Sequence, residues 1–124
     1  MLQILRIVVG LIFVGAGTLH FVRPGLYVQI IPPGFAAPLF WVLLSGLLEI
    51  LGGVGLTLRR FQRWAAYGLA LLMVAFMPVH LNMLLDPASV GVQGFSAHLL
   101  FWRLALQFVL VAFFVWLAEA RASS

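Results

Sequence analysis

The sequence contains no cysteine and no lysine, and only three of its 124 residues are acidic. Without cysteine, the chain itself cannot perform thiol–disulfide chemistry, and no disulfide bond can cross-link its fold. Charged residues make up 8% of the chain and hydrophobic residues 65%, whereas a soluble domain averages about 25% and about 45–50%. A soluble protein of this composition would aggregate. The shortage of charge therefore excludes a soluble domain and indicates an integral membrane protein.

The sequence instead contains long runs of apolar residues. A bilayer core of ~30 Å needs about 20 helical residues to cross it, and four runs reach that length. They cover residues 2–21, 39–58, 64–85 and 98–117. These runs leave room only for short connections. We therefore expect residues 1–124 to form one all-α domain, an antiparallel bundle of four transmembrane helices without a soluble catalytic domain.

The connection between the first two runs, residues 22–38, is apolar but contains four prolines and two glycines. This composition rules out a spanning helix. We expect the segment to lie at the membrane interface, with a short helix over residues 26–31 that caps the bundle. The sequence leaves open whether it is an ordinary interfacial loop or a functional lid.

Positive charge dominates the few charged residues, and all seven basic residues are arginines. Apart from Arg103, they lie near the ends of the apolar runs, three of them in the 59–63 hairpin. The positive-inside rule then predicts that the hairpin, Arg6 and Arg121 face the cytoplasm, with both chain termini on that side. This distribution indicates membrane topology and not nucleic-acid binding.

A few polar side chains interrupt the apolar runs. Glu49 lies about 15 Å deep in its run at ~1.5 Å per residue, where a carboxyl group costs at least ~2.5–3.5 kcal/mol. Its best candidate partner is Arg103, which shares a helix face with Gln107 four residues later. Three more polar side chains lie toward the same end of the other two runs: His20, His80 and Asn82.

All four runs thus contribute polar atoms to the outer half of the predicted bundle, while the inner half contributes almost none. This asymmetry predicts a polar pocket that opens to the outside and is closed below by leucine, phenylalanine and glycine packing.

Each polar residue also has a structural interpretation. Glu49 and Arg103 could be an ion pair that only orients two helices. Asn82 and Gln107 could be interhelical hydrogen bonds worth about 1 kcal/mol each. Two histidines and a carboxylate can ligate iron or zinc, but no spacing matches a local motif such as His-Glu-x-x-His, so we expect no metal site.

Together, the motifs in these runs resemble the DoxX-like membrane proteins. Their order and spacing carry the resemblance from about residue 5 to residue 117. The motifs are His20-Phe21, Pro24 with Tyr27 and Ile31-Pro-Pro33, Ser45-Gly-x-x-Glu49-x-x-Gly-Gly53, Pro78-x-x-x-Asn82-Met83 and Arg103-x-x-x-Gln107. The resemblance implies a four-helix bundle in the cytoplasmic membrane. It links the chain to proteins of quinone-dependent sulfur oxidation, redox-stress complexes, and assembly or cargo factors.

We interpret the chain first as a membrane redox component whose pocket binds a quinone or similar small ligand. Arg103, Gln107, His20 or His80 would donate hydrogen bonds to carbonyl oxygens, and Glu49 or a histidine would relay protons. No redox-cofactor motif is present, so a partner or the quinone itself would have to move the electrons. One interpretation is that the chain is a subunit of a quinone-linked oxidoreductase.

Two alternatives stay open. The chain could be a non-enzymatic assembly factor that binds a lipid or a partner's helix through small-residue faces, Gly10 and Gly17 or Gly46 and Gly53. It could also be a small transporter, which would need a homo-oligomer because four spans are too few for an alternating-access path.

Overall fold

The structure, a computed structural model, describes residues 2–32, 34–90 and 96–120. Its elements are α1 (Leu2–Val22), α2 (Pro24–Val28), α3 (Pro38–Thr57), α4 (Gln62–Leu85), a 3-10 turn η1 (Pro87–Val90) and α5 (Ala97–Glu119). The predicted all-α fold with four long helices is confirmed, and each long helix ends within a few residues of its predicted bounds. Pro33 and Arg121, which contribute to the resemblance and to the predicted topology, lie outside the described residues.

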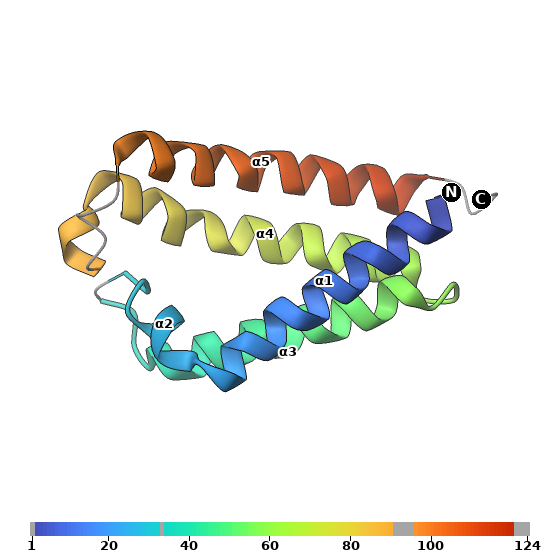
Figure 1. Ribbon diagram of the computed structural model, residues 1–124, viewed down its shortest axis with the longest axis horizontal. Helices are drawn as coiled ribbons and strands as arrows, with labels where there is room; N and C mark the ends of the chain where they lie inside the picture. Colours follow the sequence, from blue (N-terminus) through green and yellow to red (C-terminus); the bar gives the residue numbers. More distant parts are fainter. Residues whose placement is uncertain (1, 33, 91–95, 121–124) are drawn as a thin grey trace.

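The four long helices are arranged as two antiparallel pairs (Figure 1). α1 packs along α3, α4 packs along α5, and a contact between α3 and α4 joins the pairs. The pairs converge at the end where both chain termini lie and diverge toward α2 (Figure 1). We call these two ends of the molecule the terminal end and the α2 end.

The α1–α3 pair is held in backbone contact by glycines. A Cβ atom at Gly10 would collide with the backbone oxygen of Gly53, and one at Gly17 would collide with that of Gly46. All four glycines are buried. Small residues let two membrane helices approach closely. The glycine faces that the sequence suggested as docking surfaces are therefore used inside the chain itself.

Buried residues recur along α1 and α3 at spacings of three and four, which places them on one face of each helix. In α1 they are Arg6, Gly10, Gly17 and His20. In α3 they include Val42, Gly46, Glu49, Gly53 and Leu56. Since the glycines of these two series touch, Glu49 lies on the face that α3 turns toward α1.

A large hydrophobic core fills the terminal end, where the two helix pairs converge. Phe13 of α1 meets Phe114 of α5 edge to face, with 5.2 Å between ring centroids. Leu56, Leu69 and Leu117 are buried around this contact. This packing confirms that leucine, phenylalanine and glycine close the bundle on the terminal side.

The prediction that the terminal half contributes almost no polar groups is wrong. Arg6 is 3% exposed, and its Nη2 donates to the carbonyl oxygens of Leu117 at 3.2 Å and Ala120 at 3.1 Å. The side chain of Gln62, also buried, donates to that of Gln3 at 2.5 Å. An arginine near a span end usually reaches the interface, whereas Arg6 turns inward because it shares the buried face of α1.

The connection after α1 differs slightly from its prediction. The short helix is Pro24–Val28 instead of residues 26–31. It begins earlier because proline is favoured in the first turn, where its missing N–H costs nothing. The amide groups of Ile30 and Ile31 then donate to carbonyl oxygens of the preceding turn. The segment covers the α2 end of the α1–α3 pair (Figure 1).

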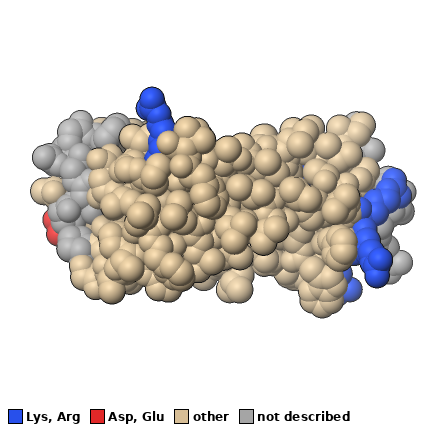
Figure 2. Space-filling view, turned by 90° about the horizontal axis from the view of Figure 1, so that it is seen from below, with Lys and Arg blue, Asp and Glu red and all other residues tan. Residues whose placement is uncertain are grey.

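The surface of the molecule is apolar along the helices. Trp64 and Leu71, for example, are 72% and 71% exposed. On the face drawn in Figure 2, the charged side chains of the described residues lie toward the two ends. Four helices are long and apolar enough to cross a membrane. The chain is therefore a multi-pass membrane protein whose helices contact the lipid bilayer.

Candidate functional site

A cavity of about 320 Å³ lies between the two helix pairs, on the α2 side of the large core. All four long helices line it, together with Tyr27, Ile30 and Ile31 from the connection after α1. Small-molecule sites typically measure about 300–1,000 Å³ and are mostly apolar with a few polar groups. Five of the six predicted pocket residues line this cavity: His20, Glu49, His80, Arg103 and Gln107.

The sixth predicted residue, Asn82, does not line the cavity. Residues along α4 that face inward follow the series Met73, Phe76, His80 and Met83, at spacings of three and four. Successive helical residues turn by about 100°, so Asn82 points away from the direction of His80. The prediction grouped the two residues by depth alone. Ser45 and Tyr27 line the cavity instead, although neither was predicted as a pocket residue.

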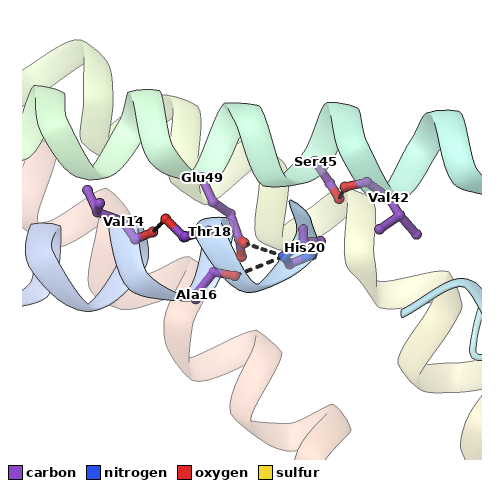
Figure 3. A network of polar contacts seen from close by, with 7 residues as sticks. All are labelled: Val14, Ala16, Thr18, His20, Val42, Ser45 and Glu49. Carbon is purple, nitrogen blue, oxygen red and sulfur yellow. Dashed lines mark hydrogen bonds and ion pairs between the residues drawn. The ribbon is translucent and has the colours of Figure 1, made fainter. Parts of the chain in front are cut away.

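Glu49 and His20 meet across the α1–α3 interface, with 3.3 Å between Oε2 and Nδ1 (Figure 3). The same Nδ1 lies 2.9 Å from the carbonyl oxygen of Ala16, one turn earlier in α1. Because a carbonyl oxygen only accepts, Nδ1 donates its hydrogen to Ala16. Glu49 is 5% exposed, and its Oε2 has no hydrogen-bond partner among the described residues. Oε2 therefore contacts the imidazole without receiving its hydrogen, which goes to Ala16.

The position of His20 is determined by its neighbours on two elements. A Cβ atom at Gly46 would collide with the Cβ atom of His20, so glycine is required for this close approach. On its other side, the His20 ring stacks on Tyr27 of α2 at 3.9 Å between centroids and 15° between planes. Burial, followed by the negative charge of Glu49, raises the pKa of the Tyr27 phenol, which stays neutral at physiological pH. The imidazole is thus clamped between α3 and α2.

The predicted ion pair between Glu49 and Arg103 is wrong. Among the described residues, Glu49 pairs with His20. Arg103 lines the same cavity from α5 but is exposed. The two residues belong to different helix pairs, which diverge toward the α2 end, whereas His20 lies on the helix packed against α3. Glu49 therefore contacts the polar side chain on the helix that packs closely against α3.

The α4–α5 wall of the cavity has a different chemistry. Gln107 is buried, and its Nε2 donates to the carbonyl oxygen of Met73 at 3.1 Å. The interpretation of Gln107 as interhelical glue is therefore confirmed, in addition to its place on the cavity wall. Nδ1 of His80 is buried without a hydrogen-bond partner among the described residues. Arg103 lines the same cavity from α5.

Two unsatisfied polar atoms thus lie on opposite walls of one cavity, Oε2 of Glu49 and Nδ1 of His80. A buried polar group without a partner costs about 1–3 kcal/mol, so a bound molecule that satisfies both would be favoured. Within the described part of the chain, no group of three or more His, Cys, Asp or Glu residues could hold a metal ion. The site is suited to a small molecule with polar atoms at two ends of an apolar ring or chain.

No curated protein matches the chain, and no solved structure matches it. A family model matches residues 9–118, a range that includes every long-helix residue on the cavity wall. The chain therefore belongs to the family described as Domain of unknown function (DUF8561).

Proposed function

We propose that this protein is a DoxX-like component of a membrane redox system and that its central cavity binds a quinone or a similar dicarbonyl molecule. The observation that carries the proposal is the opposition of Glu49 Oε2 and His80 Nδ1, both buried and both unsatisfied within the described residues. A quinone ring has carbonyl oxygens at opposite ends and apolar edges between them. It would match a cavity that is polar on two walls and apolar elsewhere.

Each wall would bind one carbonyl oxygen. On the α4–α5 side, Arg103 donates, and His80 donates when Nδ1 carries the hydrogen. On the α1–α3 side, Glu49 donates when protonated, and His20 stands next to it as proton donor and acceptor. Reduction of a quinone consumes two electrons and two protons. The residues here supply a proton path, while a partner redox protein would deliver or accept the electrons.

Membrane location and orientation form part of the same proposal. Arg6 and the three arginines of the 59–63 hairpin lie at the terminal end. The positive-inside rule places that end in the cytoplasm, with the protein in the cytoplasmic membrane. The cavity would then lie in the outer half of the bilayer, beneath α2.

The two alternatives have less support. The glycines that could have served an assembly factor as docking faces are buried between α1 and α3. A conducting path is disfavoured by the apolar core around Phe13 and Phe114, which lies between the cavity and the polar residues of the terminal end.

Quinone binding by purified protein in micelles tests the proposal, with His80→Leu compared with His98→Leu. His98 is exposed on α5 and does not line the cavity, so it is a matched control. Loss of a donor to the quinone should weaken binding by about tenfold in His80→Leu and leave His98→Leu unchanged. Glu49→Gln should also weaken binding or abolish proton transfer. Equal affinity in both histidine variants, or no binding by the unmodified protein, would contradict the proposal.

A further inference from the structure

A second cavity, of about 320 Å³, lies along the seam between α3 and α4 near the α2 end. Its wall is apolar apart from Ser45. Several of its residues belong to the outer surface, among them Trp41 at 48% exposed and Leu48 at 43% exposed. In a membrane-spanning bundle such a surface faces lipid. We call this space the seam cavity.

The seam cavity and the central cavity share part of their walls. Four residues line both: Ile31, Ser45, Phe76 and Val79. One layer of side chains therefore separates the polar site from the lipid-facing surface. The hydroxyl group of Ser45 donates to the carbonyl oxygen of Val42 on its own helix. Among the described residues, none of these four side chains makes a hydrogen bond from α3 to α4.

Within each of the two pairs, the helices pack more closely than α3 packs against α4. Backbone contact between glycines seals α1 against α3. α4 and α5 are joined by the hydrogen bond from Gln107 to Met73 and by the buried pair of Met83 and Leu100. α3 and α4, by contrast, diverge with distance from the short turn that connects them (Figure 1), and the seam cavity lies between them.

We infer that the ligand of the central cavity is an amphiphile that enters from the bilayer between α3 and α4. Its polar head lies against Glu49 and His80, and its hydrocarbon tail leaves through the seam cavity, past Ser45 and Phe76. The inference rests on the proposed function and adds to it the class of ligand and the route of entry. An isoprenoid or alkyl tail of a membrane quinone has this chemistry.

Moving a hydrocarbon tail from lipid into an apolar groove contributes little binding free energy. The experiment therefore blocks the groove with a bulky side chain and measures whether the ligand is excluded. Ala75 is exposed, lines the seam cavity and does not line the central cavity. Ala75→Trp should therefore obstruct the tail without touching the head-group site. Ala112→Trp, at an exposed position of α5 that lines neither cavity, is the matched control. Leu48→Trp, which obstructs the seam from α3, is a second variant in case Ala75→Trp does not fold.

Two probes are compared at equilibrium in micelles: the tailless ubiquinone head group and decylubiquinone, which adds a ten-carbon tail to it. Ala75→Trp and Leu48→Trp should weaken binding of decylubiquinone by about tenfold or more, as expected when a bulky side chain excludes a ligand group. Binding of the tailless head group should not change. Ala112→Trp should leave both affinities as they are.

The outcomes separate the two proposals. If the head group binds but both seam variants still bind decylubiquinone normally, the tail leaves elsewhere and this inference is overturned, while the proposed function stands. If the seam variants weaken both probes equally, they have distorted the head-group site, and the route through the seam is rejected. If neither probe binds the unmodified protein, the proposed function fails and the inference fails with it.

Discussion

The two helix pairs solve the same packing problem in different ways. α1 and α3 touch through glycines, so their backbones are in contact and their buried polar groups, His20 and Glu49, meet each other. α4 and α5 pack through side chains of mixed size, among them Leu69, Ala70 and Ala118. Their polar groups serve separate purposes: Gln107 bonds the partner helix, and His80 keeps Nδ1 unsatisfied.

The difference shows how a site can be rigid on one side and receptive on the other. Close backbone contact leaves His20 little freedom, since Gly46 touches it from α3 and Tyr27 stacks on it from α2. The opposite wall offers an exposed guanidinium, Arg103, and an unsatisfied imidazole, His80. The cavity forms where these unlike pairs diverge.

The largest expected effect comes from forcing α1 and α3 apart. A Cβ atom at Gly53 would collide with the backbone oxygen of Gly10, so Gly53→Leu should lower the free energy of unfolding by about 3 kcal/mol. Gly15 is exposed and has no atoms near its missing side chain, so Gly15→Leu is the control. Unfolding titrations in mixed micelles measure both. Equal stability of the two variants would show that glycine contact does not hold this pair.

A smaller loss of stability is expected when the hydrogen bonds between α1 and α5 at the terminal end are removed. Arg6→Leu leaves the carbonyl oxygens of Leu117 and Ala120 without their donor and should cost about 2 kcal/mol in the same titration. Arg59→Leu, at an exposed position of the hairpin, should change little. A variant Arg6→Leu that is as stable as the unmodified protein would mean that burying the guanidinium costs as much as its hydrogen bonds contribute.

Removal of the ring that stacks on His20 tests whether this stack helps to fix the α1–α3 wall of the cavity. Tyr27→Leu should lower the free energy of unfolding by about 1 kcal/mol, while Tyr27→Phe keeps the stack and should lose much less. Equal decreases in the free energy of unfolding of the two variants would indicate that the stacked ring contributes nothing to stability.

Because of Tyr27, we also expect the stability of the protein to depend on pH in the alkaline range. The folded-state pKa of Tyr27 is raised, first by burial and then by the charge of Glu49, so folding favours the neutral phenol. Its contribution to stability is fully present below the unfolded value of about 10 and is lost as pH rises through the folded value. Tyr27→Phe should therefore lose less stability above about pH 10 than the unmodified protein. Tyr67, the other tyrosine of the chain, is present in both proteins.

The smallest effect is expected within the α4–α5 pair. Gln107→Leu removes the hydrogen bond to Met73 and should cost about 0.6 kcal/mol, because single side-chain hydrogen bonds between membrane helices are weak. Gln29→Leu, at an exposed position after α2, is the control. A loss as large as that of Gly53→Leu would show that this hydrogen bond, and not the apolar core, holds the pair together.

Much of the fold could be predicted because its signals are local. The length and hydropathy of each run predict a membrane span, and the prolines of residues 22–38 predict a break. The candidate site was predicted in part for a similar reason: a polar residue deep in an apolar run must face protein or a cavity. His20, Glu49, His80, Arg103 and Gln107 all line the cavity on this basis.

The errors concern direction around the helix axis. Asn82 was grouped with His80 by depth, although the inward series of α4 passes through His80 and Met83. Arg6 was grouped only with the arginines near the ends of the apolar runs, although it falls in the same buried series as Gly10 and Gly17. The regular spacing of glycines was the signal that could have placed Arg6 and Glu49 on the α1–α3 interface.

The sequence by itself determined that the chain lies in a membrane, that it crosses it with four helices, and which polar groups are carried into the apolar layer. These properties follow from composition and run length, which every segment carries independently. Only the tertiary structure decided that Glu49 meets His20 and not Arg103. That choice depends on which helices pack closely, and a glycine contact between α1 and α3 outweighs the attraction between opposite charges on helices that diverge.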